Sequence, residues 1–230
     1  MNSLAHADHR SDRHDCTAAT TTTAADTTAT TYRPILTIDG VDVQRGEFLL
    51  CQGVNLTLSS GDVCHLIGEN GLGKTTLMSQ IAGLLPISTG QVRCVGGMGY
   101  VSHQLGISTA LSVEQNLRFL LSLYGVRADG DVIDDALTQV GLQGLGGVSS
   151  VQLSAGQMRR VGLARLFVLT PAQTPLWLLD EPLTALDTAM VATLERRISD
   201  FAAAGGAVLM TSHQNTRVAN MTLDLAEYAL

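Results

Sequence analysis

Eight residues in the first half of the chain combine glycines, a lysine and a threonine at a spacing suited to binding phosphate. Gly68-Glu-Asn-Gly-Leu-Gly-Lys-Thr75 fits the pattern GxxxxGK[ST], after a predicted strand and before a predicted helix. Glycines let successive backbone N–H groups turn inward around a phosphate, and the helix N-terminus adds favourable dipole charge. An ordinary glycine-rich turn is disfavoured because this context is satisfied. The predicted nucleotide-binding residues are Gly68, Glu69, Asn70, Gly71, Leu72, Gly73, Lys74, Thr75 and Thr76.

Within this loop, two side chains have predicted roles of their own. Lys74 can reach the β and γ phosphates of a nucleotide, and the Thr75 hydroxyl can ligate Mg²⁺. The sequence therefore predicts ATP and Mg²⁺ as ligands.

A pair of acids follows about a hundred residues later. Leu176-Trp-Leu-Leu-Asp180-Glu181 is four apolar residues and then two carboxylates. A buried strand would deliver both carboxylates at its C-terminal edge, where open α/β sheets bind ligands. We expect Asp180 to hold Mg²⁺, directly or through water, and Glu181 to polarise the water that attacks the γ-phosphate. Such a pair alone is often just a strand end, but the phosphate loop strengthens the functional interpretation.

These groups require a parallel sheet to position them, and the sequence predicts one. Apolar runs alternate with helical patterns as in a parallel α/β fold, and Leu77, Ile81 and Leu84 share one face of the helix that starts at Lys74. The predicted strands are Ile35–Ile38, Phe48–Leu58, Val63–Ile67, Leu176–Leu179 and Ala207–Met210; the other predicted helices are Val113–Leu123, opened by a capping box at Ser112–Gln115, Asp129–Val140, Met158–Leu169 and Asp187–Ala203. The mostly helical stretch at about 105–150 predicts a second lobe inserted between strand-rich segments.

Composition narrows the class of protein. The chain has 230 residues, of which 45% are hydrophobic, which is enough for a sizeable core. A formal net charge of −7 argues against a nucleic-acid partner. No apolar run approaches the roughly 20 residues of a membrane-spanning helix, so a role at a membrane requires a partner. The four cysteines, Cys16, Cys51, Cys64 and Cys94, lie far apart, as expected of reduced thiols in a cytosolic protein.

Residues 1–33 differ from the rest. They are polar at the start and then almost entirely Thr and Ala, so they have too little apolar surface to offset their ordering entropy, and we expect them to be disordered. His6, His9, His14 and Cys16 could bind a metal ion, but a solvated tail is the favoured interpretation because nothing fixes their geometry. The expected folded domain is 34–230.

Four further segments resemble the motifs of ABC-type ATPases, in the order of that family. Leu153-Ser-Ala-Gly-Gln157 resembles the signature motif, and Gln104 lies where the Q-loop is found. Thr184-Ala-Leu-Asp187 resembles the D-loop, and His213 in Thr-Ser-His-Gln resembles the switch histidine. Over about residues 35–230, the resemblance implies an α/β fold of the phosphate-loop NTPase class: a RecA-like parallel-sheet core, an antiparallel β subdomain and a helical subdomain. Only about thirty residues separate Lys74 from Gln104, so the antiparallel subdomain is expected to be trimmed.

The resemblance also implies a mechanism. Two copies would sandwich two ATP molecules, with Ser154, Gly156 and Gln157 of one copy capping the phosphate held by the loop of the other. His213 would contact the γ-phosphate and help to hold Glu181 and the water. Gln104 would sense Mg²⁺ and transmit the nucleotide state to the helical lobe. The adenine is often stacked on an aromatic side chain in this family; here Gln44 and Arg45 occupy that neighbourhood, and the Arg45 guanidinium could stack instead.

Several short sequence segments resemble one branch of the family more closely. Tyr100-Val-Ser-His-Gln-Leu-Gly-Ile107, Leu111-Ser-Val-Glu-Gln-Asn-Leu117 and Leu153–Leu166, with Ala155 where most ABC proteins carry Gly, are similar to the haem-exporter ATP-binding subunits of cytochrome c maturation, the CcmA family. This resemblance implies integral membrane partners that handle haem, a peripheral place on the cytoplasmic face of the inner membrane, and ATP hydrolysis that drives release of a haem-loaded chaperone. The alternatives are an ATPase subunit of another small-molecule transporter, a soluble ABC protein acting on ribosomes or DNA, and a nucleotide-binding module that does not hydrolyse ATP.

Overall fold

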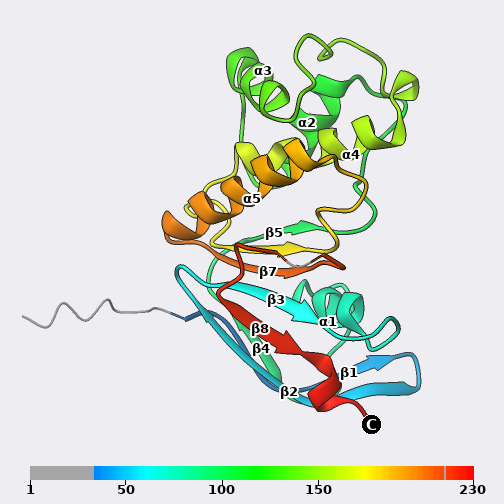
Figure 1. The fold of residues 1–230 in the computed structure, drawn as a ribbon, viewed down its shortest axis with the longest axis vertical. Coiled ribbons are helices and arrows are strands. Elements are labelled where there is room, and N and C mark those ends of the chain that lie inside the picture. Colours follow the sequence, from blue (N-terminus) through cyan, green and yellow to red (C-terminus); the bar gives the residue numbers. More distant parts are fainter. Residues whose placement is uncertain (1–33, 215) are drawn as a thin grey trace, which may run out of the picture. The chain divides into compact units, whose positions relative to one another are not determined.

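The structure is a computed structural model that describes residues 34–214 and 216–230. The predicted disordered tail and its candidate metal ligands His6, His9, His14 and Cys16 lie outside the described residues. Figure 1 shows the described part as an antiparallel sheet at one end, a parallel sheet in the middle and a group of helices at the other end.

The central layer is a five-stranded parallel sheet with strand order β5-β6-β7-β3-β8. Consecutive strands β5, β6 and β7 lie side by side, whereas β3 is inserted between β7 and β8. Parallel neighbours must be joined by crossover connections, and these leave room for helices on the faces of the sheet. The strands are β3 (Val63–Ile67), β5 (Met98–Val101), β6 (Leu176–Leu179), β7 (Ala207–Thr211) and β8 (Met221–Asp224). This arrangement confirms the parallel-sheet core expected from the sequence.

A second, three-stranded antiparallel sheet has the order β2-β1-β4. Strands β1 (Pro34–Arg45) and β2 (Phe48–Ser59) form a long hairpin, and β4 (Gln91–Cys94) pairs with β1 through residues 36–39. Helix α1 (Lys74–Ile81) lies between this sheet and the parallel sheet (Figure 1). The short connection from α1 leaves space for just one short additional strand, β4, in keeping with the trimmed subdomain predicted from the chain length there.

Most of the helices lie beyond the other face of the parallel sheet. Helix α5 runs along the sheet, and α2, α3 and α4 gather above it as a helical lobe (Figure 1). Their bounds are α2 (Val113–Ser122), α3 (Gly130–Gln139), α4 (Ala155–Ala164) and α5 (Thr188–Ala203), and short 3-10 turns occupy Ser150–Gln152, Arg165–Phe167 and Leu225–Tyr228. The predicted capping box of α2 is present, with the Ser112 hydroxyl accepting from Gln115 N.

Two hydrophobic cores flank the parallel sheet, and β6 contributes to both. Leu176 and Leu178 belong to the core shared with α1 and the antiparallel sheet, whereas Trp177 and Leu179 belong to the core shared with α5 and the helical lobe. All four are fully buried. Alternating side chains of a strand point to opposite faces, so a sheet covered on both sides reads as one continuous apolar run. Trp177 also stacks on Phe201 of α5, with ring centroids 3.6 Å apart.

Two expectations about helices were wrong. Helix α4 begins at Ala155, three residues before the predicted start, because Ser154 and Gln157 form a second capping box. Helix α1 ends at Ile81, so Leu84 does not share its buried face and is 67% exposed. The chain turns at Gly83, whose φ of +71° lies in the left-handed region that suits a residue without a side chain.

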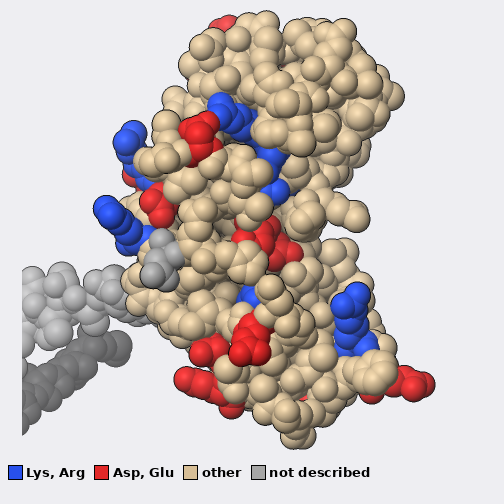
Figure 2. Space-filling model, turned by 45° about the vertical axis from the view of Figure 1, so that its right-hand side comes forward, with Lys and Arg blue, Asp and Glu red and all other residues tan. Residues whose placement is uncertain are grey.

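No helix in the described ranges is both long and apolar enough to cross a membrane. On the face drawn in Figure 2, positive and negative side chains occur in small mixed groups, and the helical lobe at the upper end carries few charges. That face therefore presents no extended basic surface.

Candidate active site

The phosphate loop connects the end of β3 to α1. Gly68, Gly71 and Gly73 have φ values of +141°, +94° and +100°, in which residues with side chains are strained. Space adds a second constraint at Gly73, where a Cβ would lie 2.7 Å from Val43 Cγ1 of β1. Gly73 caps α1 without any side-chain hydrogen bond, so the amides of the first turn stay available to an anion.

Lys74 is held inside this loop. Its Nζ donates to the carbonyl oxygens of Gly68 at 2.6 Å and Glu69 at 3.2 Å. The ammonium group is thus next to the peptide groups that would surround a phosphate. A hollow of about 220 Å³ opens here, lined by Arg45, Leu50, Asn70, Gly71, Gly73, Lys74, Thr75, Thr76, Asp180, Glu181 and His213. It unites the predicted loop with both predicted acids and the predicted histidine, and adds Arg45 and Leu50 from the antiparallel sheet.

Asp180 lies at the C-terminal end of β6 and is 3% exposed. Its Oδ2 accepts from Thr75 Oγ1 at 2.9 Å, and its Oδ1 accepts from Thr211 Oγ1, also at 2.9 Å. Both hydroxyls help to satisfy a charge that burial would otherwise penalise. The structure therefore brings together two of the three residues predicted to act on Mg²⁺, Thr75 and Asp180, which are 105 residues apart in the chain; the third is Gln104.

Glu181 has an unusual backbone for a residue with a side chain, with φ at +53°. Its N–H donates to Thr211 Oγ1 at 2.8 Å, and its Oε2 accepts from Thr184 Oγ1 at 3.2 Å. His213 Nε2 lies 3.5 Å from Glu181 Oε1, and the histidine side chain is 65% exposed. Glu181 and His213 are thus neighbours at the mouth of the hollow.

Gln104 lies in an adjoining hollow rather than in the first one. That hollow is lined by Thr75, Ser79, Leu84, Tyr100, Ser102, His103, Gln104 and Asp180. The Gln104 side chain is exposed, and its backbone carbonyl accepts from Ser102 Oγ at 2.6 Å. Because Thr75 and Asp180 line this hollow as well, Gln104 stands next to the predicted metal ligands, on the connection that leads from β5 to the helical lobe.

The signature residues lie elsewhere. Ser154, Gly156 and Gln157 line a separate open hollow with Gly141, Arg160, Ala185 and Asp187, and none of the phosphate-loop residues contributes to it. The Ser154 hydroxyl caps α4 by accepting from Gln157 N at 3.2 Å, and Gln157 Oε1 accepts from Ser154 N at 2.9 Å. The structure does not bring these residues to the phosphate loop of their own chain.

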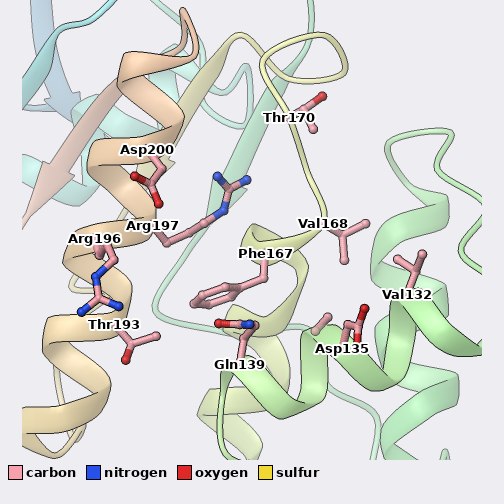
Figure 3. Close-up of a pocket in the computed structure, with 11 residues that line it drawn as sticks. Val132, Asp135, Gln139, Phe167, Val168, Thr170, Thr193, Arg196, Arg197 and Asp200 are labelled. Atoms are coloured by element: carbon pink, nitrogen blue, oxygen red, sulfur yellow. The ribbon is translucent and has the colours of Figure 1, made fainter.

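Another hollow, of about 450 Å³, is remote from this machinery. Figure 3 shows Phe167 between α3, which carries Asp135 and Gln139, and α5, which carries Thr193 and Arg196. Arg197 also lines it, but its guanidinium donates to the carbonyl oxygens of Leu166 at 2.7 Å and Leu169 at 2.6 Å. That arginine therefore ties α5 to the segment after α4.

Three residues in contact with the site were missed by sequence reasoning: Arg159, Thr184 and Thr211. Thr184 and Thr211 stand inside motifs that the sequence singled out, but their hydroxyls act on Asp180 and Glu181 in ways that spacing does not reveal. Arg159 directs a guanidinium N–H to the backbone carbonyl of Glu181. In the sequence, the one signal that points to Arg159 is its position two residues after the signature motif.

The site combines a phosphate loop with an Asp–Glu pair at the end of a parallel strand. The same chain carries a helical lobe whose helix α4 begins at the signature motif. These features together define a nucleotide-binding domain of the ABC ATPase class. The profile of the ABC transporter family matches residues 51–184. The proteins named cytochrome c biogenesis ATP-binding export protein CcmA are similar along most of the chain. The one from Methylococcus capsulatus is 43% identical over 77% of this chain and 90% of its own length, and that from Rhodobacter capsulatus is 38% identical over 84% and 88%.

Solved structures agree on the fold. An ABC transporter ATP-binding protein from Pyrococcus furiosus matches with a TM-score of 0.75 and 26% identity, over 85% of this chain and 99% of that one. An ATP-binding cassette in a dimeric post-hydrolysis state, bound to ADP and Pi, matches with a TM-score of 0.71 and 21% identity over 82% and 93%. The chain belongs to the ABC transporter family, as an ATP-hydrolysing subunit, and within it to the CcmA family.

Proposed function

We propose that this chain powers a membrane complex of cytochrome c biogenesis by hydrolysing ATP between two copies of itself. The observation that carries this proposal is the 43% identity to a cytochrome c biogenesis export protein over 77% of this chain. In this proposal the subunit is peripheral, on the cytoplasmic face of the inner membrane, and integral membrane subunits that handle haem are its partners. The N-terminal residues 1–33 lie outside the ATPase domain, which spans 34–230.

The separation of the two half-sites supports the ATP sandwich. The phosphate loop and the signature residues line different hollows of one chain, so Ser154 and Gly156 can cap a phosphate only in a second copy. The Ser154 hydroxyl caps α4 as an acceptor, which leaves its O–H free to donate to a phosphate oxygen. Neither half-site alone surrounds the phosphate charge or excludes water, whereas the closed pair does both. A solved structural neighbour is described as dimeric with ADP and Pi bound.

The oxygen donors fit Mg²⁺. Thr75 and Asp180 present a hydroxyl and a carboxylate 2.9 Å apart, which are hard ligands of the kind this ion prefers, and Gln104 lines the adjoining hollow. Mg²⁺ bound here supplies charge neutralisation for the phosphates. Lys74 and the amides of α1 hold the β and γ phosphates, Glu181 orients and polarises the attacking water, and His213 keeps Glu181 in place at the γ-phosphate.

Partner identity is tested by co-purification of a tagged Glu181→Gln variant, which retains the cradle but lacks the proposed base. Membranes are solubilised with ATP and Mg²⁺ present, and the proteins recovered with the tag are identified. We expect haem-handling membrane subunits, with haem visible in the absorption spectrum. The matched control is tagged Lys74→Ala, whose weakened nucleotide binding reduces the ATP-dependent part of the recovery.

An unrelated permease in place of those subunits would replace the substrate and leave the ATPase assignment standing. Recovery of ribosomal proteins or DNA would instead support the soluble ABC alternative.

A further inference from the structure

One buried arginine is not explained by the nucleotide-binding machinery described so far. Arg159 lies in α4, five residues after Ser154, and is 9% exposed. Its guanidinium donates from Nη2 to the backbone carbonyl of Glu181, across from α4 to the end of β6, while its Nε has no hydrogen-bond partner among residues 34–214 and 216–230. Burying an arginine is costly, and one side of this fork is left unsatisfied. Such a cost is retained where the group does something that a cheaper side chain could not do.

The group that Arg159 contacts is under conformational strain. Glu181 has a φ of +53°, a region that non-glycine residues occupy only at an energetic cost and only where the surroundings hold them. The surroundings hold this peptide from both sides. Thr211 at the end of β7 accepts from the Glu181 N–H at 2.8 Å, and Arg159 donates to the Glu181 carbonyl. The orientation of these two peptide groups fixes the direction in which the Glu181 carboxylate leaves the chain.

Electrostatics favours the same contact. Burial lowers the pKa of Arg159, while the negative charges of Glu181 and then Asp180 oppose that shift. A guanidinium stays protonated at any ordinary pH, so Arg159 is a permanent positive charge beside the proposed base and the proposed metal ligand.

We propose that Arg159 is a positioning residue that links helix α4, which begins at the signature motif, to Glu181. This inference rests on the proposed role of Glu181. Helix α4 starts at the signature residues, which act on the nucleotide of a second copy, so any shift of α4 on closure is transmitted by Arg159 to the Glu181 carbonyl of the same chain. One helix then links a phosphate in one active site with the base in the other.

The test compares Arg159→Met with Arg196→Met in the full chain, together with any membrane subunits that purify with it. Met keeps the apolar length of the side chain and removes the donors; Arg196 is an exposed arginine of α5 outside the site (Figure 3). We expect Arg159→Met to lower kcat for ATP hydrolysis by about 10- to 100-fold, the scale of a misplaced catalytic group, with KM and nucleotide affinity within about threefold of wild type. Arg159→Lys, which keeps a charged donor, should recover part of the loss.

A second measurement separates positioning from general damage. In a Glu181→Gln background, Arg159→Met should cause no further loss of turnover, since both changes act through one group. A kcat for Arg159→Met within about twofold of wild type, or a multiplicative loss in the double variant, would overturn the proposal. If Arg159→Met does not fold, Arg159→Leu, which also lacks donors, is compared with Arg196→Leu, and unchanged kcat there overturns it equally. Normal turnover of Glu181→Gln alone would instead refute the proposed base.

Discussion

Thr211 offers a sharp test of how the catalytic acids are held. It is fully buried at the end of β7, where its hydroxyl donates to Asp180 Oδ1 and accepts from Glu181 N. Thr211→Val keeps the volume, so no cavity forms, but it removes both hydrogen bonds. The lost bond to a charged acceptor costs about 1.5–3 kcal/mol, and the Glu181 amide left unpaired costs about 1–3 kcal/mol. We therefore expect the free energy of unfolding to fall by about 2.5–6 kcal/mol.

Thr211→Ser is the matched control, because it keeps the hydroxyl and loses just one buried methyl group, worth about 1 kcal/mol. Urea unfolding of both variants, followed by circular dichroism, gives the two free energies from the midpoint and the slope. If Thr211→Val proves as stable as Thr211→Ser, the two hydrogen bonds do not hold the acids in the way argued here.

Three further outcomes are expected. Glu181→Gln should bind ATP normally but hydrolyse it at least about 100-fold more slowly, measured as phosphate release; near-normal turnover would exclude it as the base. Gly90→Ala should destabilise the fold by about 2–4 kcal/mol, because Gly90 has a φ of +82° and an added Cβ would overlap the Gly40 carbonyl. Gly83→Ala, where a Cβ would meet open space, should cost only about 1–2 kcal/mol. Equal urea midpoints for the two variants would refute the clash. Burial raises the pKa of the Cys64 thiol from 9.0 to about 12. The unfolded chain therefore loses this proton first, and stability should fall by up to roughly 1.4 kcal/mol per unit as pH rises between those values. Cys64→Ala should show a shallower decline in urea midpoint, and parallel declines would contradict this.

The fold was largely predictable because its strongest signals are local. Runs of four or five apolar residues bounded by turns became β3 and β6, and the Ser112–Gln115 pattern became the capping box of α2. Strands β4, β5 and β8 were not predicted, since their four residues do not form the continuous apolar run that marks β6. Pairing with a neighbouring strand holds each of them in place. The start of α4 was misplaced because Ser154 and Gln157, inside the signature motif, also form the capping box that begins this helix.

The residues of the candidate site also fall into two groups, those that a sequence pattern identifies and those that only the fold brings to the site. Spacing in the chain was enough to select Lys74, Asp180 and Glu181, because the loop and the strand end carry chemistry in their side chains. Arg159 and Thr211 act mainly on the backbone and the acids of another segment. Such contacts depend on which residues the crossovers bring together, and a linear pattern contains no information about that. The roles assigned to all of these residues stay predictions until the variants are measured.

The alternation of side chains along β6 has a consequence for dissecting this protein. Trp177 and Leu179 belong to one core, and Leu176 and Leu178 belong to the other. Strand β6 therefore separates two hydrophobic cores and contributes to both. Deleting α5 together with the helical lobe would expose the Trp177 face to water, and deleting the antiparallel sheet and α1 would expose the opposite face. Neither half can therefore be produced as an independent soluble fragment that keeps Asp180 and Glu181 in position. Insertions and fusions should be confined to surface loops, where they leave both faces of β6 covered.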